Sequence, residues 1–152
     1  MVSPVHRETF TVRSYEIDAS GRIPIPSLFC YLQESASNHA AEYGLSMDDL
    51  MLKDLTWMIS EIHIEVKRYP VWGEKVTIET WPSLRQKYFA FREFLCFDAG
   101  DNEICRATSS WLVVDLKRNR PAVLEERGIK YELPDRGKTI AIARAKWSES
   151  AG

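Results

Sequence analysis

One stretch decides the fold of this chain: PSLFCYLQESASNHAAEY, residues 26–43. Apolar or aromatic side chains and one histidine recur along it every three to four residues, which predicts an α-helix with a buried face. Pro26 suits the first helical turn, and Gly44 suits a left-handed cap that ends the helix. Small side chains at other positions indicate a helix that is enclosed on more than one side. The recurring residues are Leu28, Leu32, Ala36, His39 and Tyr43.

Segments of alternating apolar and polar residues flank this helix in the sequence. Such alternation predicts half-buried strands, one before the helix and four after it. The turns between the last four are too short for crossover helices, so the strands are expected to be antiparallel. The order predicts an α+β fold in which a sheet wraps the helix. The expected strands are residues 8–16, 56–69, 75–81, 88–97 and 103–116.

The segment between the helix and the second strand carries a capping signal. Ser46 stands three residues before Asp49, which is the spacing of a capping box. We therefore expect a short connecting helix from residue 46 to about residue 55.

Composition and charge exclude several classes of protein. The 152 residues suffice for one domain, and 45% hydrophobic with 28% charged residues is typical of soluble globular domains. The net charge of -2 offers no broad attraction for nucleic acid or for an anionic membrane. No apolar run approaches the roughly 20 residues that span a bilayer, and the first ten residues lack the apolar core of a signal peptide. We expect a cytoplasmic protein with neither nucleic acid nor membrane as a partner.

The three cysteines give no sign of a metal or redox centre. Cys30, Cys96 and Cys105 lie in apolar segments, and no C-x-x-C spacing is present. We expect three buried thiols, and neither a metal nor a cofactor.

Three stretches carry a resemblance to a known family. They are LQESASNHAAEYG at residues 32–44, RYPVWGE at residues 68–74 with the following Trp81-Pro82, and RATSSWLVVD at residues 106–115. In order and spacing they resemble the amino-terminal hotdog domain of acyl-[acyl carrier protein] thioesterases. The resemblance implies a hotdog fold, a long central helix wrapped by an antiparallel sheet, over residues 1–122. It leaves residues 123–152 as a carboxy-terminal extension or linker, partly irregular.

The resemblance also directs attention to the turn before the helix. The family places its hydrolytic residues in a second hotdog, on an Asp-x-Asn-x-His turn with a downstream Glu. Here the corresponding turn reads Asp18-Ala-Ser20-Gly21-Arg22, so only the Asp matches. The turn is also similar to the Asp-x-x-Gly turn of single-domain 4-hydroxybenzoyl-CoA thioesterases, which implies Asp18 as nucleophile or general base. The same pattern is typical of an ordinary turn in which Asp bonds its own backbone.

Two further groups complete the predicted catalytic set. The backbone amides of Gly21 and Arg22, near the start of the helix, are candidates to polarise a thioester carbonyl as an oxyanion hole. Glu34 stands in the middle of the helix, where some hotdog enzymes use a Glu as the base, and is a second candidate. An ordinary solvated or hydrogen-bonded carboxylate is the alternative reading of Glu34.

Substrate binding is predicted on the helix and sheet faces that carry large apolar side chains. These faces are suited to line a tunnel for an acyl chain, although the same residues also suit an ordinary core. His39 is added because it lies on the apolar stripe of the helix, with a core or interface histidine as the alternative, and Asn38 because it stands beside His39. The predicted tunnel residues are Leu28, Phe29, Leu32, Trp57 and Ile59, with Phe89 and Phe91.

The predicted activity is that of an acyl thioesterase of fatty acid metabolism, which hydrolyses acyl-[acyl carrier protein] or acyl-CoA thioesters. The alternative is a non-catalytic acyl-binding or regulatory hotdog that needs a second hotdog subunit. In either case the exposed edges of a lone sheet predict a homodimer. Because an acyl carrier protein is acidic, a basic rim is expected from Lys67, Arg68, Arg85 and Lys87.

Overall fold

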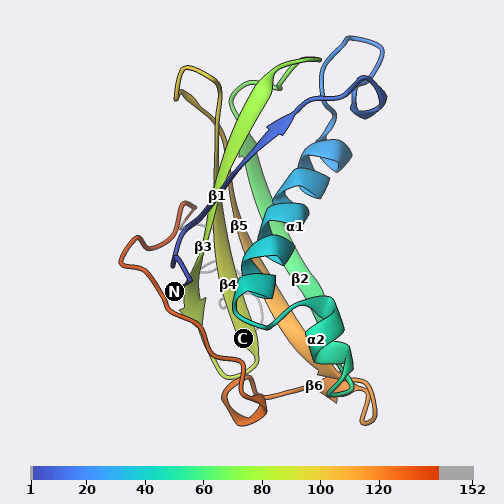
Figure 1. Ribbon diagram of the computed structural model, residues 1–152, viewed down its shortest axis with the longest axis vertical. Helices are drawn as coiled ribbons and strands as arrows, with labels where there is room; N and C mark the ends of the chain where they lie inside the picture. The colour runs from blue at the N-terminus through green and yellow to red at the C-terminus, as the bar shows by residue number, and fades with distance from the viewer. Residues whose placement is uncertain (1, 141–152) are drawn as a thin grey trace, which may run out of the picture.

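The computed structural model of the chain describes residues 2–140. In this part of the chain, one long helix, α1, lies across a strongly curved antiparallel sheet, and the short helix α2 follows it (Figure 1). The elements are β1 (His6–Thr11), a 3₁₀ turn (Ser14–Glu16), α1 (Ile25–Glu42), α2 (Met47–Met51), β2 (Leu55–Val66), β3 (Lys75–Arg85), β4 (Phe89–Phe97), β5 (Glu103–Asp115), β6 (Arg120–Pro121) and a second 3₁₀ turn (Glu125–Arg127).

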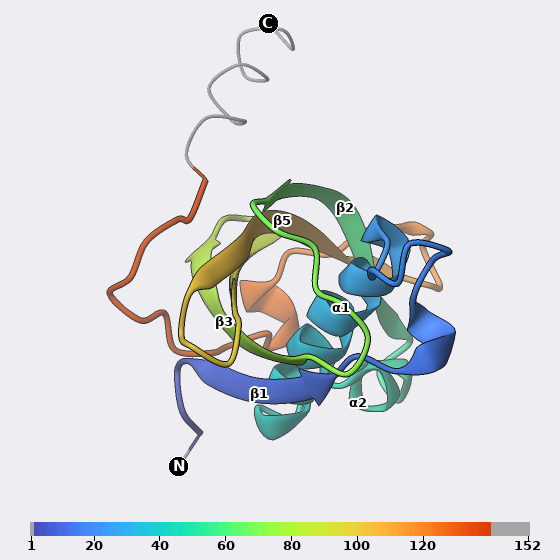
Figure 2. The ribbon, with the colours of Figure 1, turned by 90° about the horizontal axis from the view of Figure 1, so that it is seen from above.

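The five long strands form one sheet in the order β1-β3-β4-β5-β2, and every neighbouring pair is antiparallel. The two-residue strand β6 pairs with β5. Seen from above, the sheet curls around α1, so the helix lies inside the concave face (Figure 2). The predicted α+β hotdog architecture is confirmed.

Helix α1 begins and ends where the sequence predicts, within one residue. Pro26 occupies the first turn, and Pro24 precedes the helix in extended conformation. At the other end Gly44 adopts a left-handed φ of 70°, and the Leu45 amide donates to the Ala40 carbonyl at 2.9 Å. The turn satisfies carbonyl groups that the helix end leaves without partners.

One face of α1 packs into the core beneath β1, β3 and β4. Most of the predicted stripe is buried there, and Tyr43 at the end of the stripe is half-buried beside a second cluster. The stripe therefore reflects core packing, as its helical spacing predicts. The buried residues of α1 are Leu28, Tyr31, Leu32, Ser35, Ala36 and His39.

A bulge in β2 keeps its apolar side chains on the concave face. The pairing with β5 shifts between Ile59 and Glu61, which inserts one additional residue into β2. Because side chains alternate along a strand, this insertion places Ile62 on the same face as Ile59. The alternation of Ile62, Ile64 and Val66 predicted from sequence is confirmed by their packing against the core.

Several boundaries differ from the sequence prediction. The first strand ends at Thr11 rather than residue 16, because the Glu16 carboxylate accepts the Arg13 amide at 2.8 Å and closes a 3₁₀ turn. The short helix ends at Met51, and β2 starts at Leu55. Strand β3 continues to Arg85, since a register shift just after Pro82 accommodates the missing amide.

The segment after β6 contacts the α1 side of the sheet first and the opposite face later in its course. The Trp81 indole donates to the Gly137 carbonyl at 3.0 Å, and the guanidinium of Arg136 stacks on the same indole. Leu124 and Ile129 are buried in the second apolar cluster. Residues 123–140 of the expected extension thus contact the sheet, while residues 141–152 lie outside the described residues.

Candidate active site

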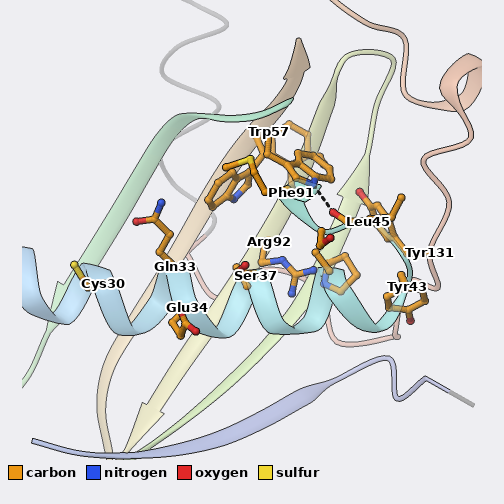
Figure 3. A pocket seen from close by; sticks show the side chains of 17 residues that line it. Cys30, Gln33, Glu34, Ser37, Tyr43, Leu45, Trp57, Phe91, Arg92 and Tyr131 are labelled. Carbon is orange, nitrogen blue, oxygen red and sulfur yellow. Dashed lines mark hydrogen bonds between the residues drawn. The ribbon is translucent and has the colours of Figure 1, made fainter. Parts of the chain in front are cut away.

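A pocket of about 360 Å³ opens between α1 and the concave face of the sheet (Figure 3). Its volume lies within the usual range for small-molecule sites. Aromatic, aliphatic and small side chains form most of the wall, with a few polar groups among them. The lining residues are Cys30, Gln33, Glu34, Ala36, Ser37, Ala40, Tyr43, Leu45, Ser46, Met47, Trp57, Pro82, Ala90, Phe91, Arg92, Trp111 and Tyr131.

The pocket forms because two faces of α1 have different surroundings. One face packs into the core, and a second, carrying Cys30, Gln33, Ser37 and Ala40 at helical spacing, remains turned toward the pocket (Figure 3). Small side chains at positions 37 and 40 leave room between the helix and the sheet. The small off-stripe residues noted in the sequence therefore line a cavity.

Two tryptophans form the sheet side of the pocket and are held by hydrogen bonds. The Trp57 indole donates to the Leu45 carbonyl at 2.9 Å, which ties β2 to the end of α1. The Trp111 indole donates to the Ser109 hydroxyl at 2.8 Å. Fixed aromatic faces of this kind present a large apolar surface without further loss of side-chain freedom.

The structure places the predicted tunnel residues in different environments. Trp57 lines the pocket with its ring. Phe91 also borders the pocket, but its ring stacks on Phe89 and lies beneath Lys138 on the other face of β4. Leu28 and Leu32 are fully buried in the core instead, because they lie on the opposite face of α1. Phe29 and Ile59 are half-buried and are not part of the pocket wall.

Asn38 and His39 lie on the β1 side of α1, outside the pocket wall. The Asn38 amide donates to both oxygens of the Glu8 carboxylate, each at 3.0 Å. His39 is fully buried; its Nε2 lies 2.7 Å from the Ser3 carbonyl, and its Nδ1 lies 3.0 Å from Nη1 of Arg92. Because guanidinium only donates, Nδ1 is the acceptor and Nε2 carries the proton. Burial, followed by the Arg92 charge, lowers the pKa of His39 to about 4.

The Asp18 turn is exposed and closed upon itself. Oδ1 of Asp18 accepts the Ser20 hydroxyl at 2.5 Å and the Ser20 amide at 2.8 Å, with the Arg22 amide at 3.4 Å. These bonds, led by that of the Ser20 hydroxyl, lower the pKa of Asp18. The Gly21 amide donates to the Asp18 carbonyl at 3.0 Å. In this conformation both amides predicted for the oxyanion hole are already engaged with Asp18, and their catalytic role stays a prediction.

Glu34 is the predicted catalytic residue that reaches the pocket. It is exposed, lines the rim from the middle of α1, and makes no hydrogen bond or ion pair within residues 2–140. Asp18 is not among the lining residues. The structure therefore brings Glu34 and Trp57 to one site and leaves the Asp18 turn apart from them.

The predicted basic rim divides into two pairs. Lys67 pairs with Glu103 at 2.9 Å, and Arg68 pairs with Glu74 at 2.5 Å, so local carboxylates neutralise both. Arg85 donates to the Ile129 carbonyl at 3.0 Å and stacks on the Tyr131 ring, which belongs to the pocket wall. Lys87 lies over the Tyr88 ring. Arg85 and Lys87 are thus the members of the set that keep a net positive charge near the pocket.

Several pocket residues were not predicted from the sequence. Arg92 alternates with Ala90 on the concave face of β4, and this period-two spacing is the signal that could have placed it beside the helix. Trp111 carries the same signal on β5. Tyr131 stands in a segment without periodicity, so nothing local predicts that it reaches the pocket.

The cysteine prediction holds for two of the three. Cys96 and Cys105 are buried partners in the β4–β5 register, whereas Cys30 is exposed at the pocket because it lies on the second face of α1. Within residues 2–140 there is no cluster of His, Cys, Asp or Glu that could hold a metal ion. No helix of this same part of the chain is long and apolar enough to cross a membrane.

The chain matches known proteins over most of its length. The family model described as acyl-ACP thioesterase N-terminal domain matches residues 3–131. A curated relative, palmitoyl-acyl carrier protein thioesterase, chloroplastic, from Cuphea hookeriana, is 36% identical over 123 residues, which cover 76% of this chain and 30% of the relative. The chain thus spans about a third of the length of the curated relatives that it matches.

Solved structures agree with this assignment. An acyl-ACP thioesterase from Bacteroides thetaiotaomicron superposes with a TM-score of 0.76 at 25% identity, covering 91% of this chain and 58% of that one. The DHNA-CoA thioesterase of Staphylococcus aureus superposes with a TM-score of 0.75 at 13% identity, covering 97% and 88%, and shows the fold alone. The hotdog architecture and the match over residues 3–131 lead to one conclusion: the chain belongs to the acyl-ACP thioesterase N-terminal domain family.

Proposed function

We propose that this chain acts in the hydrolysis of fatty acyl thioesters, with the acyl chain bound in the pocket between α1 and the sheet. The observation that carries the proposal is a pocket walled by Trp57, Trp111 and Ala90 in a domain of the acyl-ACP thioesterase family. Each methylene that moves from water into such a wall contributes about 0.8 kcal/mol. An apolar wall of this kind suits an aliphatic chain better than a polar substrate.

Glu34 is the residue that we propose as general base. A carboxylate at the pocket rim can accept a proton from water as that water attacks the thioester carbonyl carbon. The tetrahedral intermediate then expels the thiolate as the carbon–sulfur bond breaks, and the thiolate takes up a proton. Asp18 is the second candidate in the proposal, and it requires a substrate that extends from the pocket to the turn.

We further propose that a second hotdog subunit completes the site, as a homodimer partner. Within residues 2–140 no strand pairs with the outer edge of β2, although that edge is twelve residues long and carries the exposed Met58. An unpaired edge of this length is a template for another strand. A partner placed there would also cover the open side of the pocket between β2 and α1.

A non-catalytic acyl-binding hotdog is the second candidate function. The observation that favours it is the Asp18 turn, whose carboxylate and amides bond one another, and where Ser20 and Arg22 stand in place of the Asn and His of the family's catalytic turn. In this reading the chain shapes the substrate site and a second hotdog performs the hydrolysis.

The carrier of the acyl group is part of the proposal. An acyl carrier protein is favoured by the family and by Arg85 and Lys87 near the pocket, and coenzyme A is the alternative carrier. A cytoplasmic location also remains a proposal; the curated plant relatives are chloroplastic by name.

The test is hydrolysis of acyl-ACP and acyl-CoA panels by the purified chain and by three variants. We expect Glu34→Gln to lower kcat by roughly a hundredfold or more, the usual contribution of a positioned base. Asp18→Ala is expected to have a much smaller effect. Glu42→Gln, on the same helix but outside the pocket wall, is the matched control and should keep full activity.

If Asp18→Ala is inactive and Glu34→Gln is active, Asp18 and not Glu34 is the catalytic carboxylate. A chain that hydrolyses no thioester but binds acyl-CoA would support the acyl-binding candidate. A chain that neither binds nor hydrolyses any thioester would contradict both candidates.

A further inference from the structure

The inner end of the pocket gathers polar groups that the proposed hydrolysis does not use. Arg92 reaches it from β4, Tyr43 from the last turn of α1, and Tyr131 from the segment after β6 (Figure 3). These three residues are called the Arg92 site below. Three separate parts of the chain therefore converge at the end of a pocket whose remaining wall is largely apolar.

The guanidinium of Arg92 has no anionic partner in the described part of the chain. Its Nη1 donates to the Thr80 hydroxyl at 3.1 Å and to Nδ1 of His39 at 3.0 Å, and both acceptors are neutral. Within residues 2–140 no ion pair involves Arg92. Burial lowers the pKa of Arg92 to about 10, so the group keeps its charge at neutral pH. A cation withdrawn from water without a counter-charge is unfavourable until an anion reaches it.

The neighbouring hydroxyl groups are donors without acceptors. Tyr131 Oη is buried and makes no hydrogen bond within residues 2–140. Tyr43 Oη is also buried and donates no hydrogen bond within residues 2–140. Burial raises the pKa of both phenols, that of Tyr131 to about 12, so both keep their protons. Buried polar groups are normally paired, and two unpaired donors beside an unpaired cation indicate a missing acceptor.

We propose that the Arg92 site binds a carboxylate at the end of an aliphatic chain that lies along α1. The guanidinium would supply the charge, and the tyrosine hydroxyls would donate to the carboxylate oxygens. The aliphatic part would lie against the two tryptophans and Ala90 of the pocket. The pocket extends along α1 from Cys30 to Tyr43, a rise of roughly 20 Å at 1.5 Å per residue.

This inference rests on the proposed function, in which the pocket binds the acyl chain of a thioester. The carboxylate at the Arg92 site then has two possible sources. One source is the fatty acid that hydrolysis releases, bound again in the opposite orientation, because hydrolysis forms its carboxylate beside Glu34 and not beside Arg92. The other is the distal carboxylate of an ω-carboxyacyl thioester. Both present the same chemistry to the Arg92 site, and they differ in whether the carboxylate is present before or after hydrolysis.

Equilibrium binding tests the site without any need for turnover. Isothermal titration of the purified chain with decanoate and with decanol compares the same aliphatic chain with and without the charge. We expect decanoate to bind at least tenfold more tightly to the unmodified chain, and we expect Arg92→Met to abolish this preference while it retains decanol binding. Tyr131→Phe should lower decanoate affinity severalfold, because it removes one donor and keeps the ring. Lys75→Met, which removes an exposed cation of β3 outside the pocket wall, should change neither affinity.

Equal affinity of the unmodified chain for acid and alcohol, or a preference for the acid that survives both Arg92→Met and Tyr131→Phe, would overturn the inference. If Arg92→Met does not fold, Tyr131→Phe decides alone. Absence of hydrolysis would leave these affinities interpretable, so the two proposals can fail separately.

The source is identified by a kinetic comparison. A higher kcat/KM for ω-carboxydecanoyl-CoA than for decanoyl-CoA, lost in Arg92→Met, would support the distal carboxylate. Inhibition of hydrolysis by decanoate, without that substrate preference and again lost in Arg92→Met, would support the released acid.

Discussion

Arg92 and Glu93 are neighbours on β4, but they face opposite sides of the sheet and differ in the partners that their charged groups have. Glu93 is fully buried on the face away from α1, where its carboxylate accepts from Ser83 at 2.5 Å, from Thr108 at 3.0 Å and from the Thr139 amide at 3.0 Å. Arg92 faces the pocket and has only neutral partners in the described part of the chain.

The contrast distinguishes structural from receptive polar groups. A buried carboxylate whose oxygens are all occupied holds the chain together, here by fastening the segment around Thr139 to the sheet. A half-buried cation that faces a pocket and has no anionic partner is ready for a ligand. The two faces of the same strand therefore serve different purposes, stability on the outer face and binding on the inner face.

The largest expected effect comes from Glu93. Glu93→Ala removes the acceptor of four hydrogen bonds and the carboxylate that pairs with Lys138 at 3.8 Å. Loss of one partner of a buried ion pair typically costs about 3 kcal/mol. Urea unfolding should show this loss as a lower midpoint. A variant as stable as the unmodified chain would mean that the segment around Thr139 contributes nothing to folding.

His39, on the inner side of the sheet, should make the stability of the folded chain depend on pH. Its pKa falls from the ordinary 6.5 to about 4 in the folded chain, so the unfolded chain binds more protons between these values. Stability should therefore be fully present above about pH 6.5 and decrease as the pH falls toward 4. In urea unfolding from pH 7 to pH 4.5, His39→Gln should flatten this decrease, whereas His63→Gln, at an exposed position of β2, should not. Equal slopes in the two variants would refute the role of His39.

Arg92→Met should change stability much less than Glu93→Ala does. Arg92 is half-buried and has no anionic partner in the described part of the chain. Replacing such a charge by an apolar side chain of similar length is often neutral or stabilising. The Thr80 and His39 acceptors lose a donor in this variant. We expect the urea midpoint to stay close to that of the unmodified chain. A loss as large as that of Glu93→Ala would make Arg92 a structural residue rather than a receptive one.

The smallest effect is expected at the Asp18 turn. Its hydrogen bonds are local and exposed to water, which replaces them when they are removed. Asp18→Ala should give the smallest shift in thermal unfolding midpoint of the four substitutions. A shift comparable to that of Glu93→Ala would show that the turn supports the start of α1.

Much of the fold follows from local patterns in the sequence. The helical spacing of Leu28, Leu32 and Ala36 predicts both α1 and its buried face, and the alternation in β5 predicts its two faces. The early end of β1 could not be predicted in the same way, because a tertiary contact of Val12 with Glu74 and the closing bond of Glu16 determine it.

The pocket was harder to predict than the fold. A helix stripe alone does not reveal which of its apolar residues face a cavity, so Leu28 and Leu32 were assigned to the tunnel although both are core residues. Trp57 lines the pocket, in agreement with the alternation of a strand beside the helix. Tyr131 reaches the pocket through the path of the chain after β6, and that path depends on long-range contacts.

The most direct test of the acyl pocket is fluorescence quenching by a decanoyl-CoA that carries bromine in the middle of its chain. Trp57 and Trp111 line the pocket, whereas Trp72 is exposed and its amide bonds the Gly21 carbonyl beside the Asp18 turn. We predict that quenching falls sharply in a Trp57→Phe/Trp111→Phe double variant and is unchanged in Trp72→Phe. Quenching that persists in the double variant and disappears in Trp72→Phe would place the acyl chain beside the turn and contradict the account.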